Sequence, residues 1–128
     1  MKNETKQWIT YADENMLSAK ILLDSHLYNP TLQNIQQAFE KYLKSVFVEF
    51  GIKLQKTHSI SYLYSILQQN NIELFLDDDI IDIVDSIYIP TKYPFGSVLA
   101  DFEPNQDICV KLLNSLKILS KDIKKILK

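Results

Sequence analysis

Hydrophobic residues recur at steps of three and four along five stretches of the chain, the spacing that places them on one face of an α-helix. The two longest stretches cover about residues 4–26 and 30–50. Their apolar stripes are Trp8, Ala12, Met16, Ala19 and Leu23 in the first, and Leu32, Ile35, Phe39, Tyr42, Val46 and Phe50 in the second. The pattern therefore predicts two long helices, each of about 20 residues and about 30 Å.

Residues typical of helix ends flank the second stretch. Asn29 followed by Pro30 indicates an N-cap and a first helical residue, because proline's missing N–H removes no hydrogen bond there. Gly51 predicts the other end, since glycine readily adopts the left-handed conformation that closes a helix.

Three shorter helices are predicted in the second half of the chain. The first covers about residues 59–70, and the Asn70–Asn71 pair ends it. The next begins at Asp77–Asp79, whose carboxylates favour the positive end of a helix, and it ends at Pro90. The apolar stripe of the last helix is Cys109, Leu112, Leu116, Leu119, Ile123 and Ile126.

Residues 90–104 do not follow the helical pattern, because they hold three of the four prolines and one of the two glycines. A connection of this length within a compact domain is usually functional or mobile. We therefore expect this segment to be the first place to look for a site.

The composition favours one all-α domain that spans residues 1–128. Hydrophobic residues make up 46% and charged residues 23%, as in globular proteins, and two glycines are too few for a turn-rich β fold. The net charge of −2 argues against a general nucleic-acid coat, so we expect no DNA partner. No apolar run approaches the roughly 18 residues of a membrane span, which makes a cytoplasmic protein the expectation.

Neither a metal site nor a cofactor motif is predicted. A single cysteine excludes a cysteine-based zinc cage, and Cys109 lies on an apolar stripe, which favours a place in the core. The aspartate run lacks the central glycine of a calcium loop, so helix capping is the favoured interpretation. Neither glycine belongs to a phosphate-binding motif.

Gln37, Glu40 and Lys44 share one face of the second predicted helix, beside its apolar stripe. One interpretation is a solvated face with a Glu–Lys pair one helical turn apart. The other is a polar strip along a cleft, in which Lys44 presents its charge to a phosphate or another anion.

His58, Lys92 and Tyr93 are further candidates for a site. His58 precedes Ser59, so it either packs locally while Ser59 caps the helix or faces a ligand as an acid-base group. Lys92 beside Tyr93 would receive a nucleotide by charge and stacking. The alternative is an exposed lysine with Tyr93 folded over the core.

Several segments, in this order, resemble the HEPN family, whose name stands for higher eukaryotes and prokaryotes nucleotide-binding. They are the helix that carries Trp8, the run Gln36-Gln37-Ala38-Phe39-Glu40-Lys41-Tyr42-Leu43-Lys44, His58-Ser59-Ile60, and Tyr88-Ile89-Pro90-Thr91-Lys92-Tyr93-Pro94. The resemblance covers about residues 6–125 and implies an up-and-down bundle of four or five helices, commonly a homodimer. It also implies a polar cleft to which nucleotide or RNA binding is attributed. By matching position, the candidates to line it are Gln37, Glu40, Lys44, His58, Lys92 and Tyr93.

The chain departs from the ribonuclease branch of that family, which uses an arginine followed a few residues later by a histidine. It has no arginine, and no histidine follows Lys92. We therefore expect a non-catalytic module that binds a nucleotide or another anionic ligand, or that partners a small nucleotidyltransferase. The alternatives are a ribonuclease or toxin of a toxin–antitoxin pair with a non-standard site, and a purely structural dimerisation domain.

Overall fold

The computed structural model of the chain describes the backbone of residues 1–92 and 104–128, and the side chains of residues 1–88 and 104–128. The described residues form five helices and no strand. The helices are α1 (Asn3–Asp24), α2 (Tyr28–Glu49), α3 (Ile60–Gln69), α4 (Asp78–Lys92) and α5 (Gln106–Ile126). The predicted all-α, up-and-down bundle of four or five helices is confirmed.

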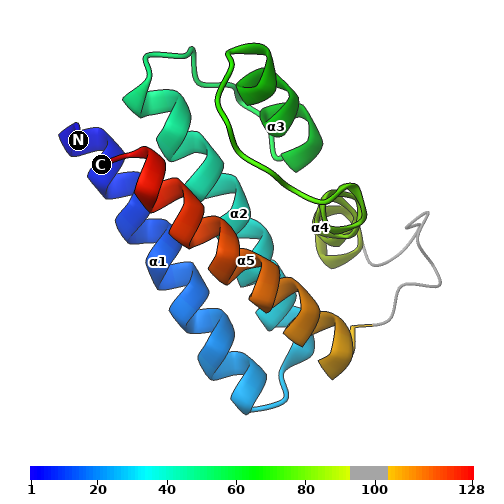
Figure 1. Cartoon of the computed structure of the whole chain (residues 1–128). Helices are drawn as coiled ribbons and strands as arrows, with labels where there is room; N and C mark the ends of the chain where they lie inside the picture. The colour runs from blue at the N-terminus through cyan, green and yellow to red at the C-terminus, as the bar shows by residue number, and fades with distance from the viewer. Residues whose placement is uncertain (93–103) are drawn as a thin grey trace.

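Helix α2 is the central element of the bundle. It lies beside α1 and α5, while the shorter α3 and α4 pack on its other side (Figure 1). Because the other four helices surround it, 13 of its 22 residues are buried. This burial exceeds a single apolar stripe and takes in polar side chains of α2, namely Thr31, Gln36, Glu40, Lys44 and Ser45.

The end of α2 is where the sequence predicted it, but its start is not. The predicted N-cap Asn29 is wrong, because Leu27 caps the helix and Pro30 is its third residue. Proline fits there as well, since the first N–H groups of a helix have no partner within it. Gly51 ends α2 as predicted: its φ is +67°, and Ile52 N–H donates to the carbonyl of Phe47 at 2.9 Å.

The remaining helix ends follow the predictions with one exception. Ser59 caps α3 by accepting a hydrogen bond from Tyr62 N–H at 3.1 Å, and Asn71 with φ +60° follows its end. Pro90 does not end α4, which continues to Lys92. A proline in the last turn removes only one bond of the helix, so two more residues can follow it.

The core joins the apolar stripes of all five helices, without Trp8 and Phe50, and Cys109 is buried within it as predicted. Phe50 was expected on the stripe of α2 but is 49% exposed, because it lies at the end of the helix. Residues 93–103, which make up most of the segment first expected to contribute to a site, lie outside the described residues. Among the described helices, none is both long enough and apolar enough to cross a membrane.

Candidate functional site

A buried carboxylate on α2 forms the centre of the candidate site. Glu40 is only 5% exposed, because α2 is covered by α3 and α4 on this side. Its Oε2 accepts a hydrogen bond from Lys44 Nζ at 3.0 Å, and its Oε1 lies 2.8 Å from His58 Nδ1. Gln36 Nε2 donates to Oε1 over a longer distance of 3.4 Å. A charge buried to this degree is tolerated when it is paired and hydrogen-bonded, as it is here.

The Glu40–Lys44 pair expected from the sequence is present, but it is not on a solvated face. The two side chains are 7% and 9% exposed, respectively. Lys44 Nζ also lies 6.0 Å from the centre of the Trp8 ring, within the range of a cation–π interaction. The lysine charge is thus enclosed between a carboxylate of α2 and an aromatic ring of α1.

His58 is the exposed member of the site, with 51% of its side chain accessible. An ionised carboxylate only accepts hydrogen bonds, so the contact with Glu40 assigns the N–H to Nδ1. Nε2 is then the ring nitrogen with which His58 can meet a ligand. The ring stacks on Tyr88 of α4 with centres 4.6 Å apart and planes 17° apart, and Gln36 Nε2 donates to the His58 carbonyl at 3.3 Å.

Asp85 of α4 holds the start of α3, directly after His58. Its carboxylate accepts hydrogen bonds from Ile60 N–H at 2.6 Å and Ser61 N–H at 3.1 Å, and Ser59 Oγ donates to it at 3.4 Å. A carboxylate suits the positive amino end of a helix. Asp85 and Tyr88 are three residues apart on α4, so one face of this helix fixes both the backbone after His58 and the imidazole ring.

The structure brings three of the six predicted site residues into direct contact, namely Glu40, Lys44 and His58. Gln37 joins them indirectly, because its Nε2 donates to Gln36 Oε1 at 2.8 Å. The Lys92 side chain and all of Tyr93 lie outside the described residues, so these two remain predictions.

Four residues of the site were not predicted: Trp8, Gln36, Asp85 and Tyr88. Gln36, Trp8 and Tyr88 belong to the segments that resemble the HEPN family, but their contacts with Lys44 and His58 join residues far apart in sequence. Asp85 caps a helix, as aspartates often do, but it caps α3 rather than its own helix. We refer below to Gln36, Glu40, Lys44, His58 and Tyr88 as the Glu40 cluster. Among the described residues, no three His, Cys, Asp or Glu side chains are placed to hold a metal ion.

Comparison with known proteins gives a family match and structural neighbours. The family model of the HEPN domain matches residues 5–126. The crystal structure of an archaeal HEPN homologue is similar with a TM-score of 0.73 and 22% identity, covering 100% of both chains. A crystal structure of a Thermus thermophilus protein has a TM-score of 0.76 and 21% identity, covering 97% of this chain and 98% of the other. No protein of curated function matches the sequence.

Proposed function

The chain belongs to the HEPN domain family, and from this premise we propose that it is a non-catalytic helical module that binds a nucleotide or a similar anionic ligand at the Glu40 cluster. One observation carries the proposal. A single buried carboxylate gathers Lys44 and His58, two side chains able to carry positive charge, in one place. When His58 is protonated, the cluster holds two cations against one anion, and an anionic ligand balances the excess.

The exposure of the cluster determines how such a ligand meets it. About half of the His58 side chain is accessible, whereas Lys44 is almost enclosed and acts mainly through its charge. A phosphate hydrogen-bonds well to an imidazolium N–H. The stacked rings of His58 and Tyr88 also provide an aromatic surface of the kind on which nucleobases stack.

Calorimetric titration with AMP, ADP, ATP and their guanine counterparts tests this proposal. We expect at least one of these nucleotides to bind, and His58→Gln and Lys44→Gln each to weaken binding about tenfold. Glutamine keeps a donor for Glu40 and removes the charge. His26→Gln and Lys6→Gln are matched controls, because both side chains are exposed and lie outside the cluster. Binding that is absent across the panel, or equal in all variants, contradicts the proposal.

Lys92 and Tyr93 are tested in the same titration, because they complete the set of residues suggested by the resemblance. Lys92→Gln removes the cation and Tyr93→Leu removes the aromatic ring. A loss of affinity in both variants would add them to the site, and unchanged affinity would restrict the site to the Glu40 cluster.

A second candidate function, RNA cleavage, is favoured by the contact between His58 and Glu40. A carboxylate that holds Nδ1 orients an imidazole so that Nε2 can accept or donate a proton, the arrangement used in general acid–base catalysis. Incubation of the protein with total RNA tests this function. Cleavage that disappears in His58→Ala and persists in His26→Ala would support it, and cleavage equal to background or equal in both variants would exclude it.

A further inference from the structure

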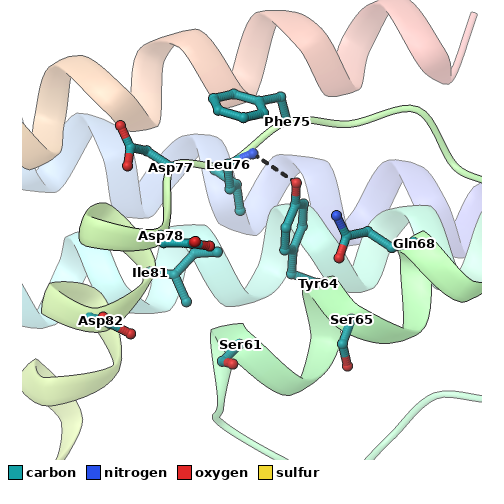
Figure 2. Close-up of a pocket in the computed structure, with 10 residues that line it drawn as sticks. All are labelled: Ser61, Tyr64, Ser65, Gln68, Phe75, Leu76, Asp77, Asp78, Ile81 and Asp82. Carbon is teal, nitrogen blue, oxygen red and sulfur yellow. Dashed lines mark hydrogen bonds between the residues drawn. The ribbon is translucent and has the colours of Figure 1, made fainter.

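The segment between α3 and α4 presents one phenylalanine to solvent. Phe75 is 77% exposed, more than any other large hydrophobic side chain among the described residues, while its neighbours Leu74 and Leu76 are buried. The hydroxyl of Tyr64 donates to the Leu74 carbonyl at 3.0 Å. It also accepts from Leu76 N–H at 3.1 Å, the bond drawn in Figure 2. Because a buried hydroxyl fixes the backbone on both sides, Phe75 is held outward by the fold.

Phe75 stands between two hollows in the surface. The hollow beside α5 has a volume of about 330 Å³, and Ile80, Ile118 and Leu119 line it together with Phe75. Lys111 is the one cation among its lining residues, against the two carboxylates of Asp77 and Asp79. Ile118 is 61% exposed, so it extends the apolar surface from Phe75 onto α5. The hollow beside α3 has a volume of about 670 Å³ and is more polar, with Ser61, Ser65 and Gln68 on its α3 side (Figure 2).

Four exposed aspartates border these hollows, and among the described residues none of them forms an ion pair: Asp77, Asp78, Asp79 and Asp82. Asp77 accepts a hydrogen bond from Asp79 N–H at 3.2 Å, so part of this charge stabilises the start of α4. The influence of the helix dipole is confined to the first turn, which ends before Asp82. Capping therefore does not account for all of the acidic charge beside Phe75.

We propose that this region docks a cationic amphipathic helix of a partner protein. We call it the Phe75 surface and define it as Phe75, Asp77, Asp78, Asp79, Asp82 and Ile118. Apolar side chains of the partner helix cover Phe75 and Ile118, in the way that amphipathic helices enter grooves through anchors spaced by three and four residues. A lysine or arginine of the partner enters the larger hollow between Asp78 and Asp82, and the acidic charge selects and orients the helix.

The charges of the chain distinguish this partner from other occupants. Four carboxylates repel phosphate groups, so a nucleic acid does not suit the Phe75 surface. In a two-fold contact between two copies of this chain, the four carboxylates of one Phe75 surface would face those of the other and repel them, and the chain has no arginine to form forked pairs with carboxylates. The proposal does not depend on ligand binding at the Glu40 cluster, whose residues lie outside the Phe75 surface.

Selection from a phage library of random peptides of about 16 residues, long enough for four helical turns, tests the proposal. We expect the wild-type chain to enrich peptides with apolar residues at steps of three and four and with lysine or arginine beside them. Synthetic copies of these peptides should bind about tenfold more weakly to Phe75→Ser and to the double variant Asp78→Asn with Asp82→Asn. Phe50→Ser is the matched control, because Phe50 is an exposed phenylalanine outside the surface, and it should bind like wild type.

Three results would overturn the proposal. One is the absence of enriched peptides. Another is the enrichment of acidic peptides, or of peptides that bind Phe75→Ser and wild type with equal affinity. The third comes from sedimentation: a wild-type dimer that Phe75→Ser converts to monomers would show that a second copy occupies the surface. Circular dichroism and unfolding of each variant exclude loss of the fold as the cause of weaker binding.

Discussion

At the scale of single residues, the buried pair of Glu40 and Lys44 and the exposed pair of Asp13 and Lys124 make a direct comparison possible. Their N–O distances are nearly equal, 3.0 and 2.9 Å, but the exposed fractions of their side chains are 7–9% and 41–44%. We expect Lys44→Ala to lower the free energy of unfolding by about 3 kcal/mol, because it leaves a buried carboxylate without its cation. Lys124→Ala should lower the free energy of unfolding by less than about 1 kcal/mol, since water screens exposed ion pairs. Urea unfolding measures both, and equal losses would contradict this account of the site.

Cys109 gives a prediction for alkaline pH. Burial raises the pKa of its thiol from 9.0 to about 11, so the folded chain keeps this proton where the unfolded chain has lost it. Its stabilising contribution is complete below about pH 9 and is lost as the pH rises toward 11, by on the order of 2 kcal/mol. In Cys109→Ser, the free energy of unfolding should therefore fall less steeply between pH 9 and 11.

Tyr42 remains in that variant and contributes in the same direction. Burial, followed by the hydrogen bond to Asp13, raises the pKa of its hydroxyl. The difference between wild type and Cys109→Ser therefore isolates the thiol, because the tyrosine is common to both. Parallel pH profiles of the two proteins would show that the thiol does not contribute.

At the scale of helices, α4 positions His58 through α3. Asp85→Asn weakens the bonds to two N–H groups of the first turn of α3, and we expect it to lower the free energy of unfolding by about 1 kcal/mol. Asp82→Asn, on the same helix but exposed, is the control and should have little effect. Amide exchange of residues 59–62 should become faster in Asp85→Asn alone, and the His58 ring resonances should shift in that variant. Unchanged His58 resonances would restrict Asp85 to a structural role in α3.

The helices were predictable because apolar periodicity and end residues are local signals. The apolar stripes, Gly51 and Ser59 each determine the backbone only within one or two helical turns. The same local signals also explain the errors at Asn29 and Pro90. Backbone groups in the first and last turns have no partner within the helix, so a residue typical of a helix end can stand at several positions there. Burial around all of α2 was not predictable, because it depends on where the four other helices pack. This is why Glu40 and Lys44 could be selected as candidates while their enclosure could not be foreseen.

At the scale of the whole molecule, the candidate site depends on three separate segments that meet at α2. Spacing placed Gln37, Glu40 and Lys44 on one face, and the position of His58 before Ser59 made it a further candidate, which the family resemblance includes as well. Nothing local indicates that Tyr88 stacks on His58 or that Trp8 faces Lys44, since these contacts arise only when α1 and α4 pack against α2. The nucleotidyltransferase partner stays a prediction, and co-purification with a candidate enzyme tests it.

The expected homodimer also stays a prediction, and an exposed face of α1 suggests where it would form. Leu17 and Ile21 are one turn apart, and their exposed fractions are 57% and 58%. In a two-fold dimer the same patch of both copies forms the contact, so an apolar strip on α1 can pack against its own copy. Sedimentation should give twice the chain mass of 14.9 kDa for wild type and the single mass for Leu17→Lys with Ile21→Lys. Phe75→Ser should remain a dimer, because its surface is assigned to a different partner. A monomeric wild type would contradict the prediction, and a dimer that survives both lysines would move the contact away from α1.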